Sequence, residues 1–259
     1  MAFLHLIADY GTGDPAFAEV VHRLRAAAPN IQVHPTAVPS FSTIATGFWI
    51  AQLGYHNPAF DGLGIYSNTA PRKHDSNEQP DNRGEELVYA RLENNVPVIA
   101  VNAGYNLSFI RNHISELRAL DIPQSGSQFR SRDFFPEAVI SILQGDKDHL
   151  AEELNVDSIP EPPDSQVAFI DGYGNIKTTL RQSTIDIEPG SKLAVRINGT
   201  EQQAHYRTNT FHIEEGDLAI APGSSGGEDR FIEIFLRGGS AADQFQQPTP
   251  GDQINLTRH

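Results

Sequence analysis

A carboxylate stands at the end of the first predicted strand, next to a turn that contains two glycines. In the segment HLIADYGTGDPAF, residues 5–17, an apolar run ends at Asp9, and Gly11 and Gly13 follow. A carboxylate in this position can accept two hydrogen bonds, for example from the two hydroxyls of a ribose. The glycines allow backbone N–H groups to approach a ligand closely. The structural alternative is that Asp9 braces its own turn.

A second group of candidate binding residues lies in FIDGYGNIKTTL, residues 169–180. Asp171, Tyr173 and Asn175 alternate there with two glycines. An aromatic ring offers a face, and an amide both donates and accepts hydrogen bonds, so this set could hold a purine. The alternative is an ordinary hairpin turn.

A third group lies in PGSSGGEDRFIEIFLRGGSAA, residues 222–242. Ser224 and Ser225 supply hydroxyl and N–H donors, and a predicted strand ends at Arg237, before Gly238 and Gly239. Hydroxyl, N–H and guanidinium donors together could hold a carboxylate. Here too, a hairpin turn is the structural alternative.

Several other kinds of chemistry are excluded or disfavoured. The chain has no cysteine, which rules out disulfides, thiol catalysis and zinc sites with sulfur ligands. There is no Gly-Lys-Ser/Thr phosphate loop and no Gly-x-Gly-x-x-Gly turn, and the ten histidines are scattered without metal-site spacing. We therefore expect no metal.

Composition narrows the class of protein. The 259 residues are 39% hydrophobic and carry a net charge of −14, a field that repels nucleic acid and anionic membranes. The sequence shows no secretory signal pattern. It also has no apolar run of about 18 residues, the length that a membrane span needs. We therefore expect a cytoplasmic protein with neither nucleic-acid nor membrane partners.

Strand and helix patterns alternate in the first part of the chain. Asp14 is a predicted helix N-cap before Pro15, and Ser40 or Ser42 is predicted to cap a second helix. Alternation of this kind favours an α/β domain with a mainly parallel sheet, in which ligands gather at the carboxyl ends of the strands. The predicted strands are 4–8, 31–34, 62–66, 85–92 and 96–102, the predicted later helices are 106–120 and 132–143, and the polar segment 72–84 is a predicted loop.

The second part of the chain contains only short strand patterns, and Asn198-Gly199 is a strong hairpin signal. We expect a small all-β domain, a barrel or sandwich. The predicted organisation is an α/β domain over 1–158, a Pro-rich linker over 159–165, the β domain over 166–246 and a loose tail over 247–259.

Four motifs in order along the chain resemble the S-adenosylmethionine hydroxide adenosyltransferase family, whose relatives include fluorinase and chlorinase. ADYGTGD resembles the family's Thr/Ser-Asp-Phe-Gly-Thr-x-Asp, and FIDGYGNIKTTL its Asp-x-Phe-Gly-Asn-hydrophobic-x-Thr-Asn. SQFRSRDFFPEAV, residues 127–139, resembles Thr-Phe-His-Gly-Arg-Asp, and GSSGGEDRFIEIFLRGGSAA resembles Asn-Ser-x-Gly followed by Glu-Ile-Ala and Asn-Gly-Ser-Ala. The order of these motifs makes the likeness more specific than any one of them.

The resemblance implies an activity and an assembly. Family members displace methionine from C5′ of S-adenosylmethionine with hydroxide, which releases adenosine, and they use no metal or other cofactor. Their site lies between the large domain of one subunit and the small domain of the next, within a homotrimer. The ligand implied here is therefore a nucleoside-containing small molecule.

The resemblance also implies roles for individual residues. Asp9 would grip the ribose hydroxyls, and Phe41 stands at an aromatic position that covers the ribose in fluorinase. The other implied contacts are Tyr173 and Asn175, with Asp171 in the same motif, at the nucleoside; Arg237 and the Gly238–Ser240 backbone, including Gly239, near adenine; and Ser224 or Ser225 near the methionine carboxylate.

The residues that activate water in the family are incompletely kept. The family's Asp falls on Tyr66 or Asn68, its His falls on Arg130, and its Arg corresponds to Arg72. Neither an amide nor a permanently protonated guanidinium can serve as a general base. Tyr66 could do so only with a strongly lowered pKa.

Three functions remain open from the sequence. The first is a divergent adenosyltransferase or hydrolase that acts on S-adenosylmethionine. The second is a halide-using enzyme, since fluorinase also has a Tyr near the position of Tyr66. The third is a protein that binds the nucleoside or S-adenosylmethionine without turning it over.

Overall fold

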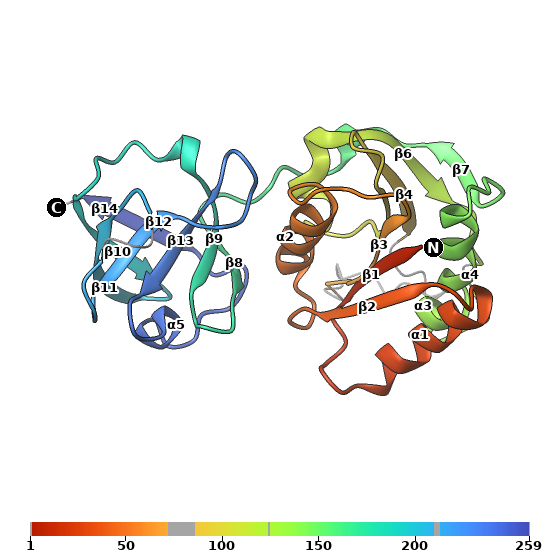
Figure 1. The fold of residues 1–259 in the computed structure, drawn as a ribbon, viewed down its shortest axis with the longest axis horizontal. Helices are drawn as coiled ribbons and strands as arrows, with labels where there is room; N and C mark the ends of the chain where they lie inside the picture. Colours follow the sequence, from red (N-terminus) through yellow and green to blue (C-terminus); the bar gives the residue numbers. More distant parts are fainter. Residues whose placement is uncertain (1, 72–85, 124, 210–212, 259) are drawn as a thin grey trace, which may run out of the picture. The chain divides into compact units, whose positions relative to one another are not determined.

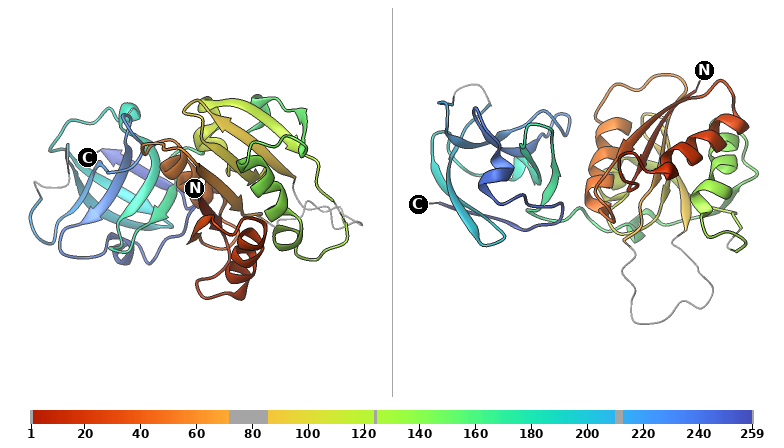
Figure 2. Two further views of the ribbon diagram at one scale, coloured as in Figure 1. Left: turned by 45° about the vertical axis from the view of Figure 1, so that its right-hand side comes forward. Right: turned by 90° about the horizontal axis from the view of Figure 1, so that it is seen from below.

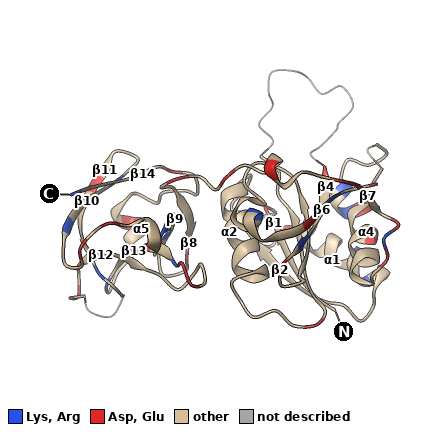
Figure 3. Cartoon of the chain, turned by 90° about the horizontal axis from the view of Figure 1, so that it is seen from above, with Lys and Arg blue, Asp and Glu red and all other residues tan. Residues whose placement is uncertain are grey.

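The computed structural model describes residues 2–71, 86–123, 125–209 and 213–258 (Figure 1). The chain divides into two compact units, Met1–Glu161 and Pro162–His259. Both units contain basic residues, Lys and Arg, and acidic residues, Asp and Glu (Figure 3). No helix in the described ranges is long and apolar enough to cross a membrane.

The N-terminal unit is built on one seven-stranded mixed sheet with the order β2-β1-β3-β5-β4-β6-β7. Helix α2 covers one face of this sheet, and α1 and α4 cover the other (Figure 2). The elements are β1 Phe3–Ala8, α1 Pro15–Ala27, β2 Gln32–Ala37, α2 Thr43–Gly54, β3 Leu63–Asn68, β4 Leu87–Leu92, β5 Pro97–Val101, the 3₁₀ helix η1 Ser108–His113, β6 Ile114–Leu120, α3 Arg130–Asp133, α4 Phe135–Leu143, β7 Leu150–Glu153 and η2 Val156–Ser158.

The sheet is only partly parallel. Strands β2, β1, β3 and β5 pair in parallel, whereas the pairs β5–β4, β4–β6 and β6–β7 are antiparallel. The expected mainly parallel sheet is therefore correct for one half of the unit. The change of direction begins at the hairpin between β4 and β5, because such a short connection can join only antiparallel strands.

Both predicted helix caps near the N-terminus are confirmed. The side chain of Asp14 accepts a hydrogen bond from the N–H of Ala16 at 2.8 Å, and Pro15 begins α1. Ser42 caps α2 by accepting from the N–H of Ala45 at 3.2 Å. These caps determine where the chain turns between β1 and α1 and where α2 begins.

The helix predicted over 106–120 is wrong. Its first part is the short 3₁₀ helix η1, and Ile114–Leu120 is strand β6, which pairs with β4 on one side and β7 on the other. Leu117 is buried, while Glu116 beside it is half-exposed, so the alternation of a strand is present. Residues 114–120 form a strand because the edge of β4 is available for pairing, and pairing and packing outweigh local propensity.

The C-terminal unit is a seven-stranded curled sheet, a half-barrel with the order β14-β10-β11-β12-β13-β9-β8 (Figure 2). This confirms the expected small β domain in outline. Asn198 and Gly199 have φ of 49° and 81° and form the turn between β10 and β11, as predicted. The elements are β8 Val167–Ile170, β9 Ile176–Arg181, η3 Gln182–Thr184, β10 Lys192–Ile197, β11 Thr200–Tyr206, β12 Leu218–Pro222, β13 Phe231–Leu236, α5 Ala241–Gln244 and β14 Ile254–Arg258.

The loose tail expected over 247–259 needs correction. Ile254–Arg258 forms β14, which pairs antiparallel with β10. Ile254 is only 1% exposed, and Leu256 packs partly against the same core. Two apolar residues in a polar segment are enough to order this strand, because the unpaired edge of β10 offers backbone groups with which the tail can pair.

Candidate functional site

The end of β1 and the start of α2 are joined at the carboxyl edge of the parallel strands. Oδ2 of Asp9 accepts a hydrogen bond from the N–H of Phe41 at 2.9 Å. Phe41 has φ of 63°, a conformation rare for a non-glycine residue, and the residue is 47% exposed. An exposed aromatic ring thus lies on a backbone segment fixed by the candidate ribose-binding carboxylate.

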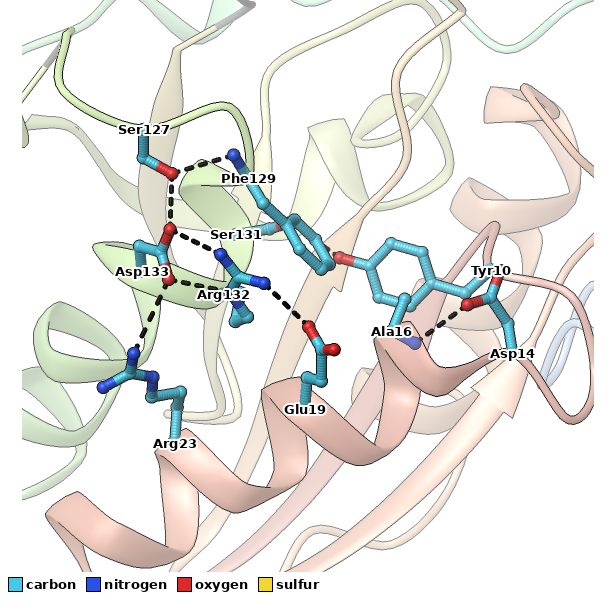
Figure 4. A network of polar contacts seen from close by, with 10 residues as sticks. All are labelled: Tyr10, Asp14, Ala16, Glu19, Arg23, Ser127, Phe129, Ser131, Arg132 and Asp133. Atoms are coloured by element: carbon cyan, nitrogen blue, oxygen red, sulfur yellow. Dashed lines mark hydrogen bonds and ion pairs between the residues drawn. The ribbon is translucent and has the colours of Figure 1, made fainter.

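Tyr10 is the centre of a hydrogen-bond network beside Asp9. Its Oη lies 2.7 Å from Oγ of Ser131 (Figure 4). The same Oη accepts a hydrogen bond from Nδ2 of Asn68 at 2.9 Å. Tyr66 donates its hydroxyl hydrogen to the backbone oxygen of Ser131 at 3.0 Å. The fold therefore brings together Tyr66, Asn68 and the segment that contains Arg130.

Sequence reasoning missed two members of this network, Tyr10 and Ser131. Each directly follows a residue that it had singled out, Asp9 and Arg130 respectively. The available signal was this neighbouring position together with a hydroxyl in each side chain.

The two tyrosines of the network are protonated at neutral pH. Burial raises the pKa of Tyr66 well above its usual value, and Tyr66 is completely buried. Burial also raises the pKa of Tyr10 to about 12, although its hydrogen bond with Ser131 acts in the opposite direction. The lowered pKa that Tyr66 would need as a general base is therefore absent.

Arg130 has a partly buried guanidinium with nitrogen atoms that are unpaired within the described part of the chain. Its Nε and Nη2 atoms are buried without a hydrogen-bond partner among the described residues, and its guanidinium lies 5.2 Å from the ring centre of Phe135. Burial lowers the pKa of Arg130, and the charge of Glu86 opposes this. An arginine still stays protonated near neutral pH. Arg72, the other predicted cation, lies outside the described residues.

Ion pairs hold the segment around Ser131 against α1 (Figure 4). Arg132 bonds Glu19 of α1 at 2.9 Å and Asp133 at 2.7 Å, and Ser127 donates to Asp133 at 2.6 Å. The hydrogen bonds from Arg132 are the main reason that the pKa of Asp133 is held far below its usual range. The Arg-Asp pair of the sequence motif thus positions Ser131.

In the C-terminal unit, Asp171 organises the turn that carries the predicted nucleoside contacts. Its carboxylate accepts hydrogen bonds from the N–H groups of Tyr173 and Asn175, at 2.9 and 3.1 Å, and from Nδ2 of Asn175 at 3.1 Å. Tyr173 is 82% exposed at the tip of the turn. Asp171 thus braces its own turn, and it presents an aromatic face to solvent.

This turn packs directly on the Gly238–Ser240 segment. Gly174 has φ of 79°, and a Cβ atom there would lie 2.1 Å from Oγ of Ser240. The N–H of Ala242 also donates to the backbone oxygen of Gly174 at 2.8 Å. Two of the three predicted binding segments are therefore neighbours, and Gly174 is required for their close approach. Directly before the Gly238–Ser240 segment, Nη1 of Arg237 donates to the backbone oxygen of Ile213.

The loop that contains Ser224 and Ser225 is stabilised by Arg181. Arg181 lies over the ring of Phe231 at 3.6 Å and donates to the backbone oxygens of Gly226 and Asp229. Within the loop Ser224 is exposed and Ser225 is buried. Of the two predicted carboxylate donors, Ser224 therefore has the more accessible side chain.

One lysine connects two of these segments. Nζ of Lys177 lies 3.0 Å from Oε2 of Glu233 and 3.6 Å from Oδ2 of Asp171. The same Oε2 lies so close to Gly223 that a Cβ atom there would be 2.3 Å away. Sequence reasoning missed this pair, for which the signal was a single charge in each of two otherwise uncharged stretches, IKTTL and FIEIFL.

The candidate residues thus form one group in each unit. No cluster of three or more histidine, aspartate or glutamate side chains suited to a metal occurs among the described residues.

Solved structures define the class of fold. The chain is similar to an uncharacterized conserved protein from Thermotoga maritima, with 16% identity, a TM-score of 0.77 and coverage of 98% of this chain and 100% of that one. It is also similar to a conserved hypothetical protein from Thermus thermophilus, with 19% identity, a TM-score of 0.66 and coverage of 99% and 100%. At these identities the likeness shows a shared two-unit fold.

A family match makes the assignment narrower. Residues 165–255 match the C-terminal domain of the SAM hydroxide adenosyltransferases, where SAM is S-adenosylmethionine. The C-terminal unit is thus similar to a domain of this family, and the match confirms the resemblance noted in the sequence over the part of the chain that contains the motifs at 169–180 and 223–242. No curated protein matches the chain.

Proposed function

We propose that the protein binds S-adenosylmethionine and transfers its adenosyl group to water, releasing adenosine and methionine. The observation that carries the proposal is the match of residues 165–255 to the C-terminal domain of enzymes with this activity. Support from the N-terminal unit comes from Asp9 and the exposed ring of Phe41, which meet at the carboxyl edge of parallel strands.

In the proposed reaction, the oxygen of water forms a bond to C5′ while the bond from C5′ to sulfur breaks. The electron pair of that bond stays on sulfur, which becomes the neutral thioether of methionine, and one proton passes to solvent. The sulfonium is already a good leaving group, so alignment of water with C5′ supplies much of the acceleration.

The proposed contacts follow the two groups of residues. Asp9 and Phe41 hold the ribose in the N-terminal group. In the C-terminal group the turn of Asp171, Tyr173 and Asn175 borders the nucleoside, whereas Arg237 and Gly239 lie near adenine and Ser224 or Ser225 near the methionine carboxylate. The rigidity of the Asp171 turn and its contact with Ser240 support this grouping.

We expect slow turnover, because neither Asn68, Arg130 nor the buried Tyr66 can remove a proton from water near neutral pH. General base assistance contributes about 10²–10⁴-fold, and that factor is the expected deficit. The test is incubation of the protein with S-adenosylmethionine, with and without chloride, followed by liquid chromatography and mass spectrometry. Release of adenosine beyond one equivalent supports the proposal.

Controls separate the alternatives. A chlorinated nucleoside formed only with chloride indicates a halide-using enzyme, and tight binding without any product indicates a binding protein. The paired substitutions Asn68→Asp and Arg130→His should increase adenosine release if the site still aligns water. An unmodified protein already as fast as its relatives would contradict the expected deficit.

We also propose that the active form is a homotrimer, as the family resemblance implies. The reason is that the candidate residues fall into one group per unit, so that neighbouring subunits could complete one another's sites. Light scattering at micromolar concentration should return three times the 28.4 kDa chain mass. A monomer mass would contradict this assembly.

A further inference from the structure

The Tyr10 hydroxyl connects two side chains that come from distant parts of the sequence. It accepts a hydrogen bond from Nδ2 of Asn68 at the end of β3, and it lies 2.7 Å from Oγ of Ser131. A phenol has one hydrogen, and the short contact with Ser131 is where that hydrogen can go. The Tyr10 hydroxyl therefore has one partner from which it accepts and one to which it can donate.

Tyr10 itself is held from several sides. Its ring makes edge-to-face contacts with Phe17 and Phe129, at centroid distances of 5.1 and 5.8 Å. Ser131 belongs to the segment that Arg132 and Asp133 hold against α1. Asn68 thus bonds to a hydroxyl that has little freedom to move.

Fixing the nitrogen of an amide also fixes its oxygen. With Nδ2 of Asn68 directed to Tyr10, the oxygen Oδ1 points away from Tyr10 and remains available as an acceptor. An amide oxygen cannot take up a proton, but it can accept a hydrogen bond and so orient a water molecule.

We propose that Tyr10 is a positioning residue, which holds the amide of Asn68 so that its oxygen orients the attacking water. This inference rests on the proposed function. It assigns to Asn68 an orienting role in place of proton removal, and to Tyr10 the task of keeping that orientation.

The substitution Tyr10→Phe tests the proposal, because phenylalanine keeps both ring contacts and removes only the hydroxyl. We expect kcat to fall about tenfold, the effect of losing one hydrogen bond, with KM changed by less than about twofold. Tyr55→Phe is the matched control, since Tyr55 bonds Glu93 at the exposed surface. Equal kcat values for Tyr10→Phe and the unmodified protein would overturn the proposal.

Repeating the Tyr10→Phe substitution in a second variant, Asn68→Asp, makes the test specific for the orientation of the Asn68 amide. In the Asn68→Asp variant both carboxylate oxygens can accept, so orientation no longer matters, and Tyr10→Phe should change kcat by less than about twofold. A tenfold loss in this background as well would mean that Tyr10 acts on general packing, against the proposal.

A readout that needs no activity separates this inference from the proposed function. Solvent exchange of the Asn68 side-chain amide hydrogens, followed by NMR, should be slow in the unmodified protein and clearly faster in Tyr10→Phe. If the unmodified protein neither binds nor converts S-adenosylmethionine, the proposed function fails. Unchanged amide exchange in Tyr10→Phe would instead overturn the positioning role of Tyr10.

Discussion

Replacing Lys177 by methionine should lower the free energy of unfolding of the C-terminal unit by about 3–5 kcal/mol. The side chains of Lys177 and Glu233 are only 12% and 9% exposed, and their charged atoms lie 3.0 Å apart. The substitution leaves the carboxylate of Glu233 buried without its cation, and Asp171 loses the same partner at 3.6 Å. Breaking a buried pair costs this much because the remaining charge has lost both water and its counter-ion.

Denaturant unfolding of the full chain measures this effect, with circular dichroism following both units. Trp49 is the one tryptophan of the sequence and lies in α2 of the N-terminal unit. Its fluorescence therefore follows the unfolding of that unit, and the denaturant midpoint that it reports should be unchanged. Lys192→Met is the matched control, because Lys192 is exposed and its loss should cost less than about 0.5 kcal/mol. A Lys177→Met, Glu233→Met double variant should recover most of the loss.

The prediction for Lys177 has a clear contrary outcome. A loss below about 1 kcal/mol, the level of an exposed ion pair, would show that solvent reaches this cluster in the folded protein. The cluster would then not be the element that connects the Asp171 turn to β13.

Replacing Asp9 by asparagine should weaken the binding of adenosine by roughly 10–100-fold, about 1.5–3 kcal/mol, the usual value for a hydrogen bond to a charged acceptor. Asparagine keeps an oxygen that can accept the hydrogen bond of the Phe41 N–H, so the connection between β1 and α2 is retained. What the variant loses is the charge and one of the two acceptor atoms offered to the ribose. Calorimetric titration of the full chain with adenosine measures the change.

Asp14→Asn provides the control for Asp9→Asn. Asp14 caps α1, and asparagine is an equally good cap, so both adenosine affinity and melting temperature should stay unchanged. If Asp9→Asn instead lowers the melting temperature and leaves adenosine affinity intact, Asp9 is a structural residue that supports the loop of Phe41. That outcome would also remove the main support of the N-terminal unit for the proposed function.

Much of the fold was predictable because its signals are local. The caps at Asp14 and Ser42 act over two or three residues, and the Asn198-Gly199 turn acts over about four. The motif around Asp171 is equally local, because the carboxylate organises N–H groups two and four residues ahead. Such features depend on only a few neighbouring residues, and together with the motif order they predicted the two-unit architecture and the family resemblance.

Only the tertiary structure decided the features that need a distant partner. Ile114–Leu120 and Ile254–Arg258 become strands because β4 and β10 offer edges to pair with. Tyr10 meets Ser131 across 121 positions of sequence, and Lys177 meets Glu233 across 56. A strand's pairing and a buried charge's counter-ion depend on which surfaces the fold brings into contact, so no local pattern specifies them.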